Sequence, residues 1–104
     1  AAGAAVCWMR GGGYEEICGT ITNTLATLGG MLCDGAKSSC AAKIATAVQA
    51  GFLGHEMAIR GHAFRNGEGL VKSDADKTVE VFGRMAREGM RTTDEEILRL
   101  MVDA

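Results

Sequence analysis

The sequence lacks three features that mark whole classes of protein. It has no surplus of positive charge, since 11 Lys and Arg face 13 Asp and Glu, and this argues against a nucleic-acid binder, which needs basic residues for phosphate contacts. It has no apolar run long enough for a bilayer, because its longest uncharged stretch, residues 17–33, carries four Thr, one Asn and three Gly. It has no basic and apolar leader typical of secretion.

Proline is absent and aromatic residues make up 5% of the 104 positions, whereas small residues are abundant. Alanine (16) and glycine (15) together fill 31 positions, which favours closely packed helices. The 47% hydrophobic content and the net charge of −2 argue against a disordered chain. These figures fit one domain or part of one.

Charge is spread unevenly along the chain. Residues 1–53 hold six charged residues and residues 54–104 hold the other eighteen. A chain this short cannot bury its whole apolar half alone, so we expect that half to pack against something outside this sequence. The composition of residues 1–9 also resembles the last turns of a helix that begins earlier in a longer polypeptide. We therefore expect residues 1–104 to form the C-terminal portion of a larger all-helical domain, with the N-terminal part of the protein absent.

The hydrophobic periodicity and the helix-end signals predict an all-α bundle of four to five helices. Helices are expected over residues 1–10, over residues 14–28 between two glycine runs, and from Ser38 or Ser39, either of which can act as the cap, past His62 to a loop at Asn66, Gly67 and Gly69. Ser73 with Asp76 reads as a capping box that opens a helix to about Glu88, and Thr93 with Glu96 repeats the pattern. The predicted apolar faces are Ile17, Ile21, Leu25 and Leu28 in the second helix; Ala41, Ile44, Ala45, Val48, Phe52, His55 and Ile59 in the third; and Ile97, Leu98 and Met101 in the last.

Small residues also recur along the third predicted helix. Ala47, Ala50, Gly51 and Gly54 would let a neighbouring helix approach closely or mark a bend.

The cysteines and histidines do not form a self-contained metal site by their spacing. No Cys-x2-Cys pair and no zinc-finger pattern occurs. His55 and His62 lie about 10.5 Å apart along a helix axis, too far to share one ion, so we interpret them as surface or half-buried side chains. Cys7 and Cys18 fall on apolar helix faces, where a thiol behaves as a small hydrophobic group.

Residues 30–43 bring thiols, a carboxylate, ammonium groups and hydroxyls together at a turn that leads into a helix. The helix N-terminus and Lys37 would stabilise a thiolate, which is the form that binds iron. Cys33 and Cys40 are the two thiols of this turn, and Asp34 is its carboxylate. Three alternatives stay open: a disulfide between the two cysteines, buried structural thiols, and ordinary turn and helix-end roles for Asp34 and Lys37.

Three stretches resemble one known family. They are Gly11-Gly12-Gly13-Tyr14-Glu15-Glu16-Ile17, the run Gly30-Met31-Leu32-Cys33-Asp34-Gly35-Ala36-Lys37-Ser38-Ser39-Cys40-Ala41-Ala42-Lys43, and Gly89-Met90-Arg91-Thr92-Thr93-Asp94-Glu95-Glu96-Ile97-Leu98. They are similar to the C-terminal part of the L-serine dehydratase alpha-chain-like family, in the branch that contains L-cysteine desulfidases. The resemblance covers nearly the whole chain, and its Cys-Asp-Gly-Ala-Lys turn is the specific part.

The resemblance implies an enzyme that uses a [4Fe–4S] cluster held by three cysteinates. Such an enzyme eliminates water or hydrogen sulfide from L-serine or L-cysteine and gives pyruvate and ammonia. Carried over by position, Cys33 is a cluster and metal ligand and Cys40 a weaker candidate, while Asp34 and Lys37 are catalytic candidates that line the site. Because another ligand of such proteins lies shortly before the first residue of this chain, we expect the isolated chain to hold no intact cluster and to be inactive.

The partners expected from the sequence are a small amino-acid substrate, the remainder of the same polypeptide and a second copy of the chain, with no nucleic acid and no membrane. We expect a cytoplasmic protein. The rival interpretation is a non-catalytic helical module for packing or oligomerisation, with structural or redox-active cysteines.

Overall fold

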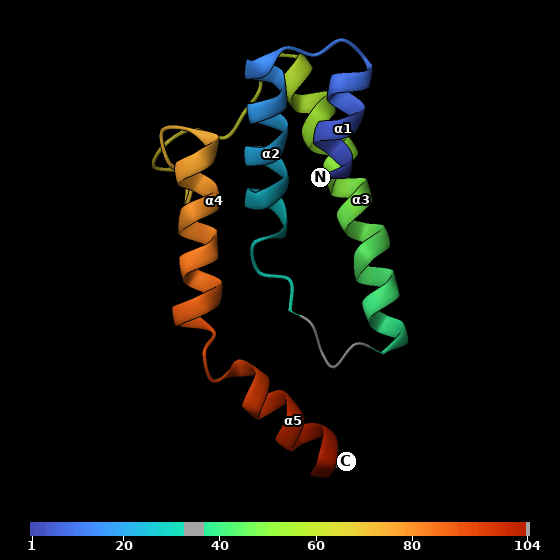
Figure 1. Cartoon of the computed structure of the whole chain (residues 1–104), viewed down its shortest axis with the longest axis vertical. Helices are drawn as coiled ribbons and strands as arrows, with labels where there is room; N and C mark the ends of the chain where they lie inside the picture. Colours follow the sequence, from blue (N-terminus) through green and yellow to red (C-terminus); the bar gives the residue numbers. More distant parts are fainter. Residues whose placement is uncertain (33–36, 104) are drawn as a thin grey trace.

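The computed structural model describes residues 1–32 and 37–103, and every regular element in these ranges is a helix (Figure 1). This confirms the predicted all-α fold. None of the helices within the described ranges combines the length and the apolar character needed to cross a bilayer. The elements are α1 (Ala2–Met9), α2 (Tyr14–Leu28), α3 (Ser38–Ile59), α4 (Ala75–Arg84), the π-helix η1 (Met85–Gly89) and α5 (Thr93–Asp103).

Helices α1, α2 and α3 pack on one another and form the centre of the molecule (Figure 1). Helix α4 packs against α2 alone, and α5 packs on none of the other described helices. The resulting shape is elongated, with extents of 49 × 27 × 16 Å and a radius of gyration of 15.3 Å. A compact domain of this length has a radius of gyration of about 13 Å. The helices therefore form a flat and open arrangement.

The central helices approach closely because glycines face one another or face backbone. A Cβ atom built on Gly3 of α1 would lie 2.5 Å from the carbonyl oxygen of Gly51 in α3. A Cβ atom on Gly54 would lie 3.1 Å from the carbonyl oxygen of Thr20 in α2. The predicted close approach at the small residues of α3 is thus confirmed, and it leaves no room for a methyl group at these points.

Helices α1 and α3 end in the same way. The backbone N–H of Gly12 donates to the carbonyl of Cys7 at 2.8 Å, and Gly11 adopts a φ of +84°. At the end of α3, the N–H of His62 donates to the carbonyl of Met57 at 2.9 Å, and Gly61 adopts a φ of +77°. Both ends are Schellman motifs, in which a glycine takes the left-handed position that other residues disfavour.

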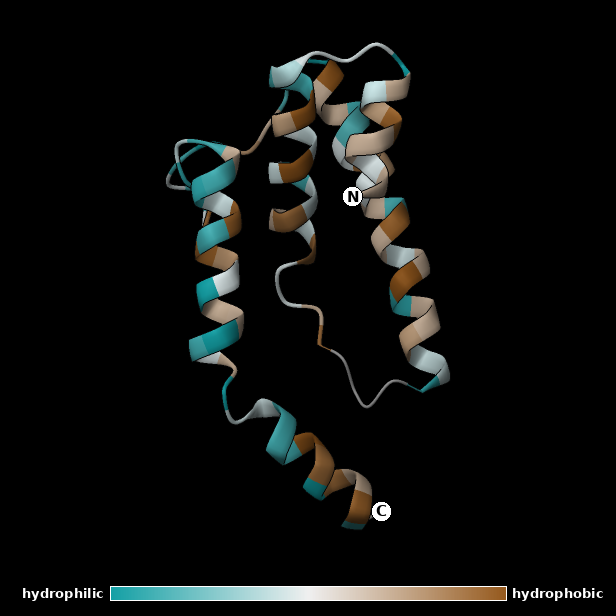
Figure 2. Cartoon of the chain, in the orientation of Figure 1, coloured by the Kyte–Doolittle hydropathy of each residue, from teal (hydrophilic) through white to brown (hydrophobic). Residues whose placement is uncertain are grey.

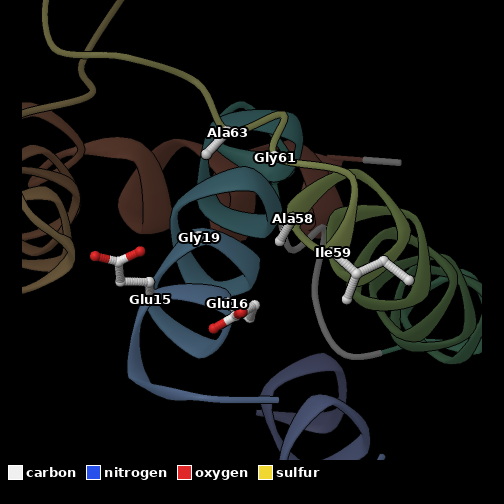
Figure 3. A pocket seen from close by; sticks show the side chains of 7 residues that line it. All are labelled: Glu15, Glu16, Gly19, Ala58, Ile59, Gly61 and Ala63. Carbon is white, nitrogen blue, oxygen red and sulfur yellow. The ribbon is translucent and has the colours of Figure 1, made fainter.

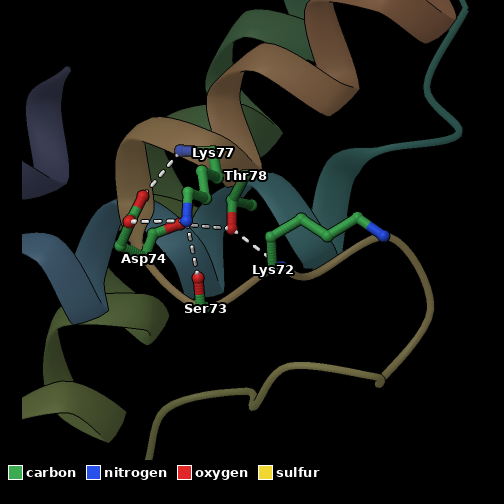
Figure 4. A network of polar contacts seen from close by, with 5 residues as sticks. All are labelled: Lys72, Ser73, Asp74, Lys77 and Thr78. Carbon is green, nitrogen blue, oxygen red and sulfur yellow. Dashed lines mark hydrogen bonds and ion pairs between the residues drawn. The ribbon is translucent and has the colours of Figure 1, made fainter.

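The predicted helix starts are correct within a residue or two, but two of the predicted caps are wrong. Asp74, not Ser73, caps α4: its carboxylate accepts a hydrogen bond from the Lys77 backbone N–H at 2.7 Å (Figure 4). The Thr78 hydroxyl strengthens this end because it donates to the Asp74 carbonyl and accepts from the Lys72 N–H. A carboxylate suits the positive end of a helix better than a hydroxyl does.

Helix α3 begins at Ser38, as predicted, but Lys37 occupies the cap position and its side chain makes no capping hydrogen bond. The helix that was expected to reach Glu88 runs to Gly89, and its last turn widens into the π-helix η1.

The buried face of α3 shares only His55 with the predicted apolar stripe. The helix buries Ala50, Gly51, Gly54 and His55, whereas Ile44, Val48, Phe52 and Ile59 are exposed. Close packing of α1 and α2 selects the side of α3 that has small residues, so the large apolar residues lie beside the contact instead of within it. The apolar side of α5 likewise buries no residue, and the bulky residues of α2 are only half-buried around Thr20, Thr22 and Asn23.

Candidate functional site

The turn that carries the predicted ligands joins α2 to α3. Cys33 and Asp34 lie outside the described residues, so the structure neither places them nor tests their roles. Lys37 is exposed at the cap position of α3, and Cys40 is half-buried in the first turn of that helix. The backbone N–H of Cys40 donates to the Lys37 carbonyl at 2.8 Å, which fixes both residues to the same helix end.

The other two thiols stand far from this turn in the sequence and are engaged in packing. Cys7 is fully buried, and a Cβ atom on Gly12 would collide with its sulfur, so the glycine makes room for the thiol. Cys18 is half-buried on α2 and is a free thiol, as Cys7 is. Within the described ranges no three His, Cys, Asp or Glu side chains gather closely enough to hold a metal ion.

Cys18 lines a cavity of about 400 Å³ between α2, the loop at residues 63–66 and the start of α4. Tyr14 lies one turn before Cys18 and borders the same cavity. A hydrogen bond with Cys18 and the charge of Cys18 raise the pKa of the Tyr14 phenol above its usual 10.0, and the Asp76 carboxylate, desolvation and the Asp74 carboxylate add to the effect in that order. The phenol therefore stays protonated throughout the physiological range.

A second cavity, of about 350 Å³, lies between the first turns of α2 and the C-terminal end of α3 (Figure 3). The carboxylates of Glu15 and Glu16 stand on the α2 side, and Ala58 and Ile59 come from α3. Gly19 forms part of the wall, where a Cβ atom would lie 3.2 Å from that of Ala58. The cavity is acidic on one side and apolar on the other, and sequence reasoning did not identify it.

His55 is the main correction to the sequence analysis. We expected a surface or half-buried side chain, but the imidazole is 1% exposed, and neither ring nitrogen has a hydrogen-bond partner in the described chain. His62, in contrast, is exposed. The position of His55 beside Gly51 and Gly54 explains the difference, because the close approach of α1 and α2 covers whatever side chain lies there.

Asn23 is a structural anchor that the sequence analysis missed. Its side-chain nitrogen donates to the carbonyl oxygens of Gly54 at 3.1 Å and of His62 at 3.0 Å, and its oxygen accepts from the Phe64 N–H at 2.9 Å. The side chain is fully buried. One amide thus ties α2 to α3 and to the loop that follows. A lone Asn within a threonine-rich helix gives no sequence signal for this role.

The chain matches the family model described as serine dehydratase alpha chain over residues 1–99. It belongs to that family. The match includes the turn with Cys33 and Cys40 and extends into α5, so the family resemblance proposed from the sequence is confirmed.

Curated relatives support the same family assignment. A UPF0597 protein of Treponema denticola is 51% identical over 98% of this chain, one of Desulfitobacterium hafniense is 46% identical over 97%, and one of Lachnoclostridium phytofermentans is 46% identical over 98%. The chain covers 24% of the length of each of these three relatives. No solved structure matches the chain.

Proposed function

We propose that this chain is the C-terminal part of a [4Fe–4S]-dependent lyase that eliminates water or hydrogen sulfide from L-serine or L-cysteine, giving pyruvate and ammonia. The observation that carries the proposal is the family match over residues 1–99, which includes the Cys33–Cys40 turn. Membership of the family links this chain to serine dehydratases in general. The cluster, the substrates and the ligands are the proposed part.

The positions of the four cysteines support the turn with Cys33 and Cys40 as the source of the cluster ligands. Cys7 is enclosed in the packing around Gly12, and Cys18 lies beside Tyr14 at the start of α2. Cys40 is in the first turn of a 22-residue helix, where backbone N–H groups favour a negative charge. We assign Cys33 as a cluster ligand and keep Cys40 as the weaker candidate for a second one. A third thiolate must then come from polypeptide beyond this chain, because the donor set here is incomplete.

The cluster, when bound, would supply an open iron that acts as a Lewis acid toward the β-hydroxyl or β-thiol of the substrate. The residues of this chain have other tasks. We propose that Lys37, which is exposed at the start of α3, attracts the carboxylate of a small amino acid. Asp34 would orient a ligand or the substrate from the same turn. An oxygen-sensitive cluster also suits a reducing compartment, so we propose a cytoplasmic location.

The deciding experiment is an anaerobic assay of pyruvate release from L-serine and from L-cysteine by the full-length protein that contains this chain. Cys33→Ser is expected to abolish both pyruvate release and the brown absorbance of the cluster. Cys18→Ser is the matched control, since it changes a thiol away from the proposed site, and it should keep colour and activity.

Two results would contradict the proposal. A full-length enzyme that is colourless and free of iron yet still releases pyruvate would exclude the cluster. Full activity of Cys33→Ser with only some loss of stability would instead support the rival interpretation, a non-catalytic helical module with structural cysteines.

A further inference from the structure

One side of α3 carries large apolar side chains that the packing of α1 and α2 leaves exposed, although Ile59 also borders the cavity between α2 and α3. Ile44 is 65% exposed, Phe52 43% and Ile59 49%, and Val48 is exposed between them. These four residues recur at helical spacing along one side of a helix of 22 residues, which is about 33 Å long. We call them the outer stripe of α3. Figure 2 shows that apolar segments continue along α3 toward its N-terminal end, past the start of α1.

The molecule as a whole exposes more surface than a compact monomer of its mass does. The chain exposes 7278 Å², whereas a compact monomer of 10.9 kDa exposes about 5,600 Å². A standard protein interface buries about 800 Å² of each partner's surface. The difference between the exposed area of this chain and that of a compact monomer is larger than this. Large contiguous apolar patches on a helix face usually mark an interaction surface.

The outer stripe continues an interface that already exists. Helix α1 contacts α3 through Gly3 and Gly51, and the ion pair between Arg10 and Glu56, at 3.5 Å, lies near its other end. The residues of α3 before Gly51 extend beyond this contact, and they include Ile44 and Val48.

We propose that the outer stripe of α3 is the docking face for the rest of the full-length polypeptide. The relatives named above are about four times as long as the region that they share with this chain, so about three quarters of the family polypeptide must pack elsewhere. A second copy of the chain is the competing occupant, and the test below separates the two. The inference does not depend on the lyase activity.

Hydroxyl-radical footprinting of Phe52 and Ile59 tests the proposal without any substitution. The 104-residue chain and the full-length protein that contains it are labelled at matched concentrations, with the oligomeric state of each followed by light scattering. In the full-length monomer we expect labelling of both residues to fall about fivefold or more, since a covered side chain keeps little of its exposed area. Equal labelling in the two proteins overturns the proposal, and so does protection that appears only when the full-length protein dimerises.

A substitution made in both proteins gives a second readout. Phe52→Lys is expected to leave the melting temperature of the 104-residue chain unchanged, because the side chain is exposed there, but to lower that of the full-length protein. Gln49→Lys is the matched control, because Gln49 is exposed on another side of α3 and should be neutral in both. A full-length protein that tolerates both substitutions equally contradicts the proposal.

Discussion

The side-chain nitrogen of Asn23 lies 3.1 Å from the carbonyl oxygen of Gly54 and donates a hydrogen bond to it across the contact between α2 and α3. Gly54 lacks a side chain, and this lets the two helices come close enough for the bond to form. Burial of an amide is costly unless its hydrogen bonds are made. Here the polar group is paired at three points, so it specifies how the two helices and the following loop fit together.

The first prediction concerns this amide. Asn23→Leu removes three hydrogen bonds and leaves two carbonyls and one N–H without their partner, so we expect the free energy of unfolding to fall by about 2–4 kcal/mol. Urea denaturation of the chain measures the change. Thr46→Val is the control, because the Thr46 hydroxyl donates to the Ala42 carbonyl on an exposed face, and its loss should cost less than about 0.5 kcal/mol. A loss below about 1 kcal/mol for Asn23→Leu would contradict the anchoring role.

The second prediction concerns the close approach at Gly54. Gly54→Ala should improve helix propensity by about 1 kcal/mol, but its methyl group would lie 2.9 Å from the Thr24 hydroxyl and 3.1 Å from the Thr20 carbonyl. Because backbone cannot yield as a flexible side chain can, we expect a net loss of about 1–2 kcal/mol in unfolding free energy.

Gly83 in α4 provides the matched control for that measurement. A Cβ atom there meets nothing within 4 Å, so Gly83→Ala should raise the free energy of unfolding by about 0.5–1 kcal/mol. If both substitutions stabilise the chain, the distance between α2 and α3 is not limited by Gly54.

The third prediction concerns the buried imidazole of His55, whose ring nitrogens have no partner in the described chain. An unpaired buried polar group carries a desolvation cost, so an apolar residue of similar volume should be preferred. We expect His55→Leu to raise the free energy of unfolding of the chain by about 1 kcal/mol. Thermal and urea unfolding check this. A clear loss of stability would show that the imidazole makes a hydrogen bond in solution.

Much of the helical architecture could be predicted from the sequence. Helix α2 is bounded by glycine runs on both sides, and its start and end were predicted to the residue. The starts of α3 and α5 were also correct, but α3 ends at Ile59 and not beyond His62, because Gly61 takes the left-handed position that closes the helix. Local chemistry determines such boundaries, so they can be recognised without knowledge of the neighbours.

The packing could not be predicted to the same degree, because it depends on distances between helices. Periodicity assigned the large residues Ile44 and Phe52 to the buried face of α3, but glycines at 51 and 54 define the face that α1 and α2 cover. His55 is buried by the same contact. The candidate site could be predicted even less well from local sequence patterns, because the roles of Cys33 and Asp34 came from family resemblance. Both residues lie outside the described ranges.

The fourth prediction concerns Tyr14, the single tyrosine of the chain. Its phenol should titrate above 10.0, because the Cys18 thiol beside it raises the pKa. Since the folded-state pKa is the higher one, the stabilisation is present below pH 10.0 and is lost as the pH rises through the raised value. Ultraviolet absorbance of the tyrosinate follows the titration directly.

Cys18→Ala should shift this titration back toward the usual pKa, whereas Cys40→Ala, on another helix, should leave it in place. An unchanged curve for Cys18→Ala would show that the thiol is not the cause of the shift. The carboxylates of Asp76 and Asp74 and the desolvation of the phenol would then be the remaining causes of the raised pKa.

The last prediction concerns the metal content of the chain alone. If Cys33 and Cys40 supply two thiolates and a third comes from polypeptide beyond residues 1–104, anaerobic reconstitution with iron and sulfide should leave the isolated chain without an intact cluster and without pyruvate release. Iron and sulfide analysis of the monomeric fraction decides the matter, and the full-length protein prepared in the same way is the positive control. Four irons bound per isolated chain would mean that the donor set is complete within these residues, and the assignment of an external ligand would have to be withdrawn.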